Sequence, residues 1–295
     1  MDNNSLKKYY RIIIPLIIVL AIVFLTLVAV TFKNERDRKN REALEAQSQA
    51  LAERIVTVMF PEGYSVSQIA EKLEENGVTA KDEFFQYVKN PPQSLLEKLG
   101  LEDASDKIFP LEGYLMPDTY EFYKDEQPSV VVDKMVDNFL SRVSEKYNNY
   151  KSSFEASSQK CYSLDEILTI ASVIQKESGY VSENAKVASV IYNRLNSSMP
   201  LQCDVTGNYL EKYVRPYVDD YSDEYENNYD TFKCAALPAG AICNPGVDAI
   251  SAAMSPAKTD YLFFVTDSKD TSIFYYAETY SEHLANCRTA GYTGY

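Results

Sequence analysis

The most informative segment of the chain is SLDEILTIASVIQKESGYVSENAKVASVIYNRLNSSMPLQCD, which runs from Ser163 to Asp204. Ser163 and Glu166 form an S-x-x-E capping box, a pattern that predicts the first turn of a helix. The apolar residues that follow recur at three- and four-residue spacing, so one face of this helix should pack against a core: Ile167, Ile170, Ala171 and Ile174. Gly179 predicts the end of the helix, and a second helix is expected over about 183–196.

Glu177 continues the apolar stripe three residues beyond Ile174, just before the predicted helix end. A carboxylate is costly to hold in an apolar setting, so the pKa of this side chain should rise. A carboxyl group that keeps its proton near neutral pH is what general-acid catalysis requires. The alternative is an ordinary solvated glutamate at a frayed helix terminus beside Lys176, and the pattern alone leaves both interpretations open.

A long uncharged segment lies near the N-terminus. Residues 12–32 are IIIPLIIVLAIVFLTLVAVTF, 21 residues without a charge, and at 1.5 Å per residue a helix of this length crosses a bilayer core of about 30 Å. We interpret 12–32 as a transmembrane helix, 1–11 as a cytoplasmic lead and 33–53 as a solvated helical stalk. A cleaved signal peptide is the alternative. We expect the following domain to be extracytoplasmic, although the basic residues just after the span favour the opposite orientation.

The composition excludes some classes of function. The chain of 295 residues has a formal net charge of −14, so the phosphates of nucleic acid would repel it. Its five cysteines form no C-x-x-C pair and it has one histidine, His283, so we expect no metal site and no cofactor. The cysteines allow two disulfides and one free thiol, or five reduced thiols. His283 is interpreted as a packed or capping residue.

The chain predicts an α+β fold with an N-terminal transmembrane helix and two further parts. The pattern of residues 54–92 predicts a strand followed by two helices. This order resembles a LysM-like glycan-binding module, and a packing domain without a ligand is the alternative. Residues 93–160 form a connector that includes FPLEGYLMPDTYEF, a groove-bordering segment too rich in Pro and Gly for one regular helix. Residues 161–295 form a larger mixed domain, with Glu177 at a helix terminus and a sheet built partly from 261–265 and 273–276.

Several long motifs, in order, resemble those of the endolytic murein transglycosylases of the MltG, or YceG-like, family. Together with the apolar span they cover most of the chain. The principal matches are LEGYLMPDTYEF (111–122), ASVIQKES (171–178), KVASVIYNRL (186–195), MPLQCDVT (199–206), YDTF (229–232) and LPAGAICNPG (237–246). The sequence departs from the family at Cys203, where a Ser or Thr is usual.

The resemblance implies that 161–295 is a catalytic domain of a lyase in which Glu177 is the catalytic residue. Such an enzyme cleaves the β-1,4 bond between MurNAc and GlcNAc without water and leaves 1,6-anhydro-MurNAc ends. Cleavage of nascent strands would terminate glycan elongation beside peptidoglycan synthases and division or elongation proteins, on the outer face of a bacterial cell membrane. A lysozyme-type hydrolase and a non-catalytic peptidoglycan-binding scaffold are the alternatives.

Further residues are candidates for sugar binding, with a purely structural role as the alternative for each: Ser178, Asn193, Gln202, Asp204, Thr206, Tyr229 and Thr231. Asp204 is also the residue that could convert the reaction to hydrolysis if it lay across the cleft. Tyrosines recur every fourth residue from Tyr209 to Tyr229. We interpret this segment as a surface insertion whose rings stack on sugars, with local packing as the alternative.

Overall fold

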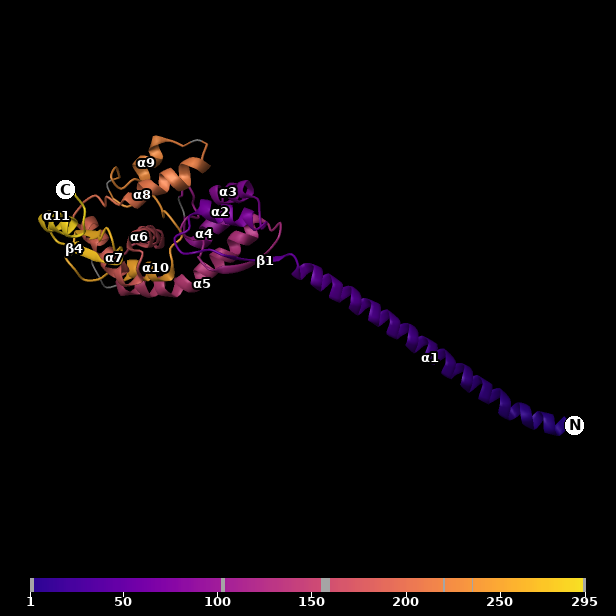
Figure 1. The fold of residues 1–295 in the computed structure, drawn as a ribbon. Coiled ribbons are helices and arrows are strands. Elements are labelled where there is room, and N and C mark those ends of the chain that lie inside the picture. Colours follow the sequence, from indigo (N-terminus) through magenta and orange to yellow (C-terminus); the bar gives the residue numbers. More distant parts are fainter. Residues whose placement is uncertain (1–2, 102–103, 155–159, 220, 235, 294–295) are drawn as a thin grey trace. The chain divides into compact units, whose positions relative to one another are not determined.

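The computed structural model describes residues 3–101, 104–154, 160–219, 221–234 and 236–293 (Figure 1). Helices dominate it, and its strands form two small two-stranded sheets, so the predicted α+β class is confirmed. The chain forms two compact units, residues 1–55 and 56–295, and each is described by itself.

The first unit is dominated by one long helix, α1 (Asn3–Ala52), with Pro15 inside its apolar part. The described apolar side chains of this helix are almost all exposed, Ile12, Phe24 and Leu25 among them. Among the described residues, α1 is the one helix whose length and composition suit a membrane crossing. The predicted span and the predicted stalk are therefore parts of a single continuous helix.

The second unit begins with strand β1 (Ile55–Met59), helices α2 (Val66–Glu75) and α3 (Lys81–Lys89), and the short helix α4 (Gln93–Leu99). The predicted order of one strand and two helices is confirmed. Ser65 and Gln68 form the predicted capping box at the start of α2. The partner of β1 is β2 (Thr119–Tyr123), so the small sheet is completed by a strand from the predicted connector.

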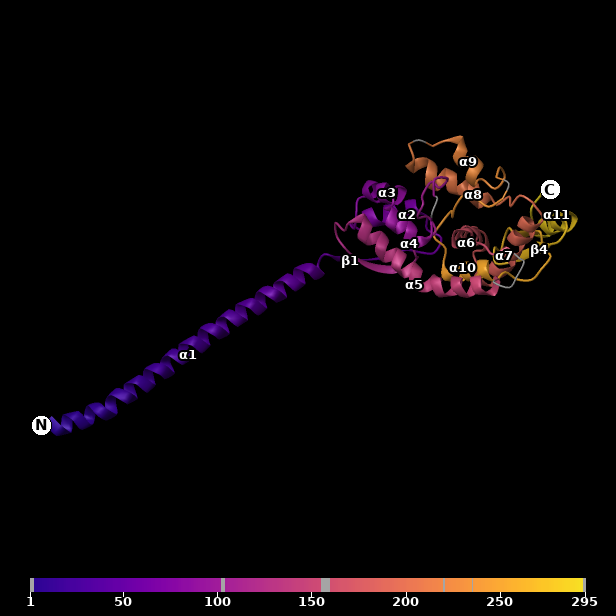
Figure 2. The same cartoon turned by 180° about the vertical axis from the view of Figure 1, so that it is seen from behind.

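Helix α6 (Leu164–Ser178) lies at the centre of the second unit, where Figures 1 and 2 show it end-on. It contacts α7 (Val181–Asn196) and α10 (Val247–Met254), and α10 also contacts α5 (Pro128–Phe154). The residues from 167 to 174 are all buried, so the helix is enclosed by protein on every side over two turns. Its capping box is present: the Ser163 hydroxyl accepts from the Glu166 amide at 3.1 Å, and the Ser163 amide donates to the Glu166 carboxylate at 2.8 Å.

The tyrosine-rich segment forms α8 (Asp204–Tyr209), a π-helical turn (Leu210–Val214), a 3-10 turn (Arg215–Tyr217) and α9 (Asp223–Tyr229). Its rings contact protein. Tyr209 and Tyr229 are buried, and Tyr217 lies 5.5 Å from the ring of Phe85 on α3 and donates a hydrogen bond to Glu71 on α2. Together with Tyr217, three further rings of the segment are partly buried against the core, which favours local packing over sugar stacking: Tyr213, Tyr221 and Tyr225.

The chain ends in an antiparallel hairpin and a helix. Strands β3 (Phe263–Thr266) and β4 (Phe274–Ala277) pair with Phe263 opposite Ala277, and α11 (Tyr280–Thr289) packs against both strands. This confirms the predicted strand segments. His283 stacks on Phe263 with ring centroids 5.2 Å apart, which is the packing role predicted for it. All five cysteines lie within the described residues and carry free thiols.

Candidate functional site

Glu177 lies in the last turn of α6, where the core helix reaches the surface. The helix ends because Gly179 adopts the left-handed conformation (φ 60°), which glycine enters without a side-chain clash. Glu177 is half-buried, while its neighbour Ser178 is buried. A negative charge is disfavoured here for two reasons: the surroundings exclude water, and the C-terminal end of a helix carries a partial negative charge.

The proton affinity of Glu177 reflects this setting. Burial raises the pKa of its carboxyl from 4.5 to about 7, and the negative charge of Asp204 adds to the rise. A hydrogen bond from the Cys203 thiol favours the ionised form and opposes the rise. Near neutral pH the carboxyl is therefore divided between its protonated and ionised forms, so it can both donate and accept a proton.

The loop that carries Cys203 is held in place by Arg194 of α7. The Arg194 guanidinium donates to the carbonyls of Pro200 (3.1 Å) and Leu201 (2.7 Å), and also to the carbonyl of Leu262 beside the β3–β4 hairpin (2.6 Å). The next residue, Gln202, has a φ of 51°, which is an uncommon backbone conformation for a residue with a side chain. Strained residues of this kind concentrate at functional sites.

Two buried threonines hold the backbone of Cys203 from both sides. The Cys203 amide donates to the Thr231 hydroxyl at 2.8 Å, and the Thr206 hydroxyl donates to the Cys203 carbonyl at 2.8 Å. The two hydroxyl oxygens are 3.0 Å apart. Both side chains are fully buried, so they fix the loop that places Cys203 and Asp204 beside Glu177.

The other predicted sugar-binding residues have different surroundings. Gln202 and Asp204 are exposed on the loop next to Glu177. Ser178 is hydrogen-bonded to Asn184, and Asn193 donates to the carbonyls of Thr259 (2.8 Å) and Tyr261 (2.9 Å). The buried hydroxyl of Tyr229 accepts a hydrogen bond from the amide of Ile108. The structure thus places four of the predicted residues in or against the loop that carries Cys203 beside Glu177: Gln202, Asp204, Thr206 and Thr231. The other three form contacts within the protein: Ser178, Asn193 and Tyr229.

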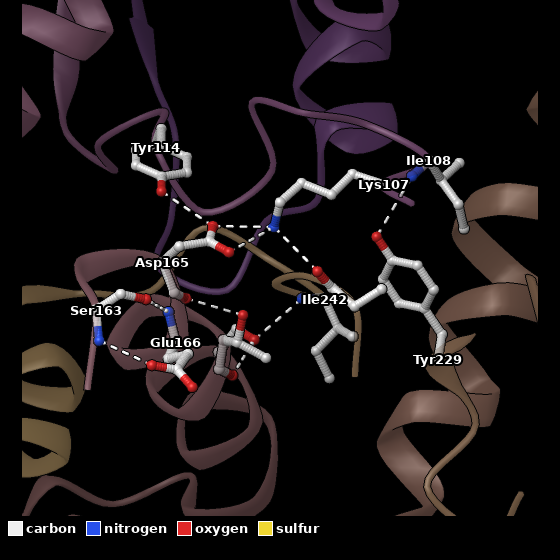
Figure 3. A network of polar contacts seen from close by, with 11 residues as sticks. Lys107, Ile108, Tyr114, Ser163, Asp165, Glu166, Tyr229 and Ile242 are labelled. Carbon is white, nitrogen blue, oxygen red and sulfur yellow. Dashed lines mark hydrogen bonds and ion pairs between the residues drawn. The ribbon is translucent and has the colours of Figure 1, made fainter. Parts of the chain in front are cut away.

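A polar network at the other end of α6 fixes that helix in the unit (Figure 3). The Lys107 ammonium bridges the two carboxylate oxygens of Asp165, at 2.9 and 2.8 Å, and the Ala239 carbonyl, at 3.0 Å. The Tyr114 hydroxyl donates to Asp165 at 3.0 Å. Asp165 lies in the first turn of α6, where the helix dipole also favours a negative charge.

Comparison with known proteins assigns the chain to a family. The sequence model that describes the YceG-like family matches residues 26–289. The chain belongs to the YceG-like family. A yceG-like protein from Listeria monocytogenes, known from a 2.6 Å crystal structure, has a similar fold, with a TM-score of 0.65 and 29% sequence identity over 78% of this chain and 75% of that chain.

Two relatives carry the name endolytic murein transglycosylase. The one from Streptococcus pneumoniae serotype 2 (strain D39) is 31% identical over 252 residues, which is 79% of this chain and 44% of that protein. The one from Bacillus subtilis (strain 168) is 32% identical over 235 residues, which is 77% of this chain and 62% of that protein. This YceG-like chain therefore spans about half the length of the curated relatives it matches.

The YceG-like fold contains a second unusual carboxyl group, Glu112, which the sequence analysis missed. It is 3% exposed. Both of its oxygens lie 3.0 Å from the amide of Val66, the first residue of α2, and it accepts further hydrogen bonds from Tyr209 (3.1 Å) and Asn244 (2.9 Å). Burial raises its pKa to about 8, against these hydrogen bonds and the nearby positive charge of Lys176. The sequence did contain a signal for this buried acid, since Glu112 stands between apolar residues in FPLEGYLM.

The arrangement around Glu177 can carry out proton transfer. The Glu177 carboxyl, with its pKa near 7, is influenced by the Cys203 thiol and by the charge of Asp204. Within the described parts of the chain, His, Cys, Asp and Glu side chains form no group of three that could hold a metal ion. A carboxyl group with this pKa can act as a general acid or a general base.

Proposed function

We propose that this YceG-like protein is a membrane-anchored endolytic peptidoglycan transglycosylase. It cleaves β-1,4 bonds between MurNAc and GlcNAc in nascent glycan strands, leaves 1,6-anhydro-MurNAc ends and so terminates glycan elongation. Two findings support the proposal: membership of the family and the names of its relatives. The observation that carries it is the half-buried carboxyl of Glu177, with its pKa raised to about 7 at the end of the central helix.

One carboxyl group is enough for this reaction. Protonated Glu177 donates its proton to the bridging oxygen as the bond from that oxygen to C1 of MurNAc breaks. The resulting carboxylate accepts the proton of the MurNAc 6-hydroxyl as its oxygen bonds to C1. The proton lost in the first half of the reaction is regained in the second, and no water is consumed. Hydrolases that use two carboxyl groups need the second one as a nucleophile or base.

The loop beside Glu177 supplies the remaining functions in this proposal. The exposed side chains of Gln202 and Asp204 contact the sugars, and the negative charge of Asp204 helps Glu177 to keep its proton. The buried hydroxyls of Thr206 and Thr231 hold the loop in position. Ser178, Asn193 and Tyr229 support the site through the protein contacts described above rather than by reaching the scissile bond.

The proposal also places the protein in the cell. Residues 12–32 of α1 span the membrane, and 33–52 extend the helix beyond it by about 30 Å. The second unit then lies outside the cytoplasm, with 54–92 as a LysM-like module, 93–160 as a groove-bordering connector and 161–295 as the catalytic domain. Peptidoglycan synthases and division or elongation proteins are the proposed partners, since the substrate is the strand that they produce.

Mass analysis of the products tests the reaction. We expect purified peptidoglycan treated with the protein to yield fragments with 1,6-anhydro-MurNAc ends. Glu177→Gln should lower the rate by about 100-fold or more, whereas Glu145→Gln, which changes an exposed glutamate on α5, should leave it unaltered. Reducing ends that incorporate water would identify a hydrolase instead. Binding of glycan strands without any cleavage by the unaltered protein would identify a scaffold.

A further inference from the structure

A cavity lies beside the segment that leads into α6, at the end of this helix opposite Glu177. Its volume is 640 Å³, and its walls come from the last turn of α5, the segment that leads into α6, the last turns of α7 and residues 253–259. Neither Glu177 nor any residue of the loop 200–204 lines the cavity, so it is distinct from the Glu177 site. One predicted sugar-binding residue, Asn193, lines it.

Aromatic rings line the inner part of this cavity. The rings of Tyr162 and Tyr192 meet edge to face with centroids 5.2 Å apart, and Tyr150 and Phe154 lie 4.8 Å apart. The hydroxyls of two of these tyrosines are engaged with the protein: Tyr150 accepts from the Tyr162 amide at 3.2 Å, and Tyr192 donates to the Ala253 carbonyl at 2.6 Å. These bonds fix the rings. Tyr150 and Tyr162 are buried and the Lys160 ammonium lies 4.2 Å over the Tyr162 ring, so the partly exposed rings of Phe154 and Tyr192 are the apolar surface that a ligand can reach.

The rim of the cavity is polar and carries positive charge. Asn196 and Ser255 are exposed there, and so are two lysines, Lys160 and Lys258. Lys160 forms an ion pair with Glu166 at 2.8 Å. For Lys258 the described part of the chain supplies no carboxylate within ion-pair distance. A positive rim in a protein with a net charge of −14 favours ligands that carry a negative charge.

We propose that this cavity is a second peptidoglycan-binding site, which holds a sugar of the strand against the partly exposed rings of Phe154 and Tyr192 and a stem-peptide carboxylate at Lys258. A cavity of this size, lined by both aromatic and polar side chains, suits a disaccharide-peptide, whose sugars and peptide also present both kinds of surface. The assignment rests on the proposed function for its ligand class. A strand bound here and cleaved at Glu177 is held at two points, which selects positions inside a strand and strands that carry peptides.

Calorimetry on the full-length Glu177→Gln protein tests the site without turnover of the ligand. The probe is a purified disaccharide-tetrapeptide of peptidoglycan, and a chitin oligosaccharide without a peptide serves as the second ligand. We expect Lys258→Glu to weaken binding of the disaccharide-tetrapeptide at least tenfold and to leave binding of the oligosaccharide unchanged. The matched control is Lys269→Glu, an exposed lysine in the β3–β4 turn, which should alter neither.

Two other results of the calorimetry would contradict a peptidoglycan-binding site in this cavity. Equal affinity of the Lys258→Glu protein and its parent for the disaccharide-tetrapeptide would show that the cavity does not hold the stem carboxylate. Equal losses with both ligands would show that Lys258 does not recognise a carboxylate. The cleavage assay with unaltered protein separates the two proposals: anhydro ends together with no effect of Lys258→Glu refute the second site alone, and a selective effect without anhydro ends refutes the transglycosylase alone.

Discussion

Three influences decide whether the Glu177 carboxyl holds a proton. Burial and the charge of Asp204 favour the protonated form, and the Cys203 thiol favours the ionised form. The first two prevail, since the pKa rises from 4.5 to about 7. A general acid must be protonated when it meets its substrate, so cleavage should fall as the pH rises above about 7. The chain thus gains a usable acid by placing a carboxyl where its ionised form is unfavourable.

The raised pKa of Glu177 should also lower the free energy of unfolding at alkaline pH. Because the folded protein binds this proton more tightly than the unfolded chain does, the stability that it contributes is fully present below pH 4.5 and is lost as the pH rises through about 7. We expect Glu177→Gln to be more stable than the parent at pH 8, by at most about 3 kcal/mol, and to show little difference at pH 4.5. Urea denaturation at the two pH values measures this, and an equal effect at both would contradict it.

Cys203 offers a way to move the pKa of Glu177 without removing the acid. A hydroxyl is a stronger hydrogen-bond donor than a thiol, so Cys203→Ser should stabilise the ionised carboxylate and shift the alkaline fall in activity to lower pH by roughly half a unit. Cys203→Ala removes the donor and should shift the fall to higher pH. The pH dependence of kcat/KM measures both. Shifts in the same direction for the two variants would indicate a general disturbance of the loop instead.

Glu112 connects elements that are far apart in the sequence. Its partners Val66, Tyr209 and Asn244 are 46, 97 and 132 positions away, on α2, on α8 and in the loop before α10. A network of this kind joins the α2 segment to the helix that begins directly after Cys203. The contacts are non-local, and this is why the sequence did not reveal Glu112: no short-range pattern specifies partners at such separations.

Substitutions at Glu112 should separate its charge from its hydrogen bonds. With a pKa of about 8 the carboxyl is mostly protonated at pH 7, and Gln reproduces that neutral form, so Glu112→Gln should be tolerated. Glu112→Ala leaves the buried amide of Val66 and its other partners unsatisfied and should cost about 3 kcal/mol. The stability that the Glu112 proton contributes should be lost between pH 4.5 and about 8, because the pKa is raised in the folded state. Glu112→Gln should remove this part of the pH dependence and leave the part that Glu177 contributes.

Denaturation of the three proteins at pH 6 and pH 8.5 provides the measurement. A Glu112→Gln protein as unstable as Glu112→Ala would contradict the view that the neutral form is the native one. A Glu121→Gln control should lose stability between the two pH values as much as the parent does, since Glu121 is exposed on β2.

Helix ends and the apolar face of the core helix were predictable because their signals are local. The capping boxes at Ser65 and Ser163 and the stop at Gly179 each depend on residues within one turn, and the structure has all three. The pairing of β1 with β2 was not predicted, since the two strands come from different predicted modules. Nor did spacing reveal that the tyrosines after Tyr209 face the protein, because a four-residue period describes a face of a helix and not what that face contacts.

The orientation of the whole molecule in a membrane can be tested with a thiol that the chain already has. Cys161 is exposed, whereas Cys203, Cys243 and Cys287 are buried. Cys234 is intermediate, and burial raises the pKa of its thiol, which slows its reaction with maleimides.

If the second unit lies outside the cytoplasm, a membrane-impermeant maleimide should label intact cells that make the protein, and Cys161→Ser should remove most of that label. The basic residues after the apolar segment favour the reverse orientation, in which labelling would appear only after lysis. Translocation of a domain of this size does not depend on those flanking charges, and the proposed substrate lies outside the membrane, so we expect the label on intact cells.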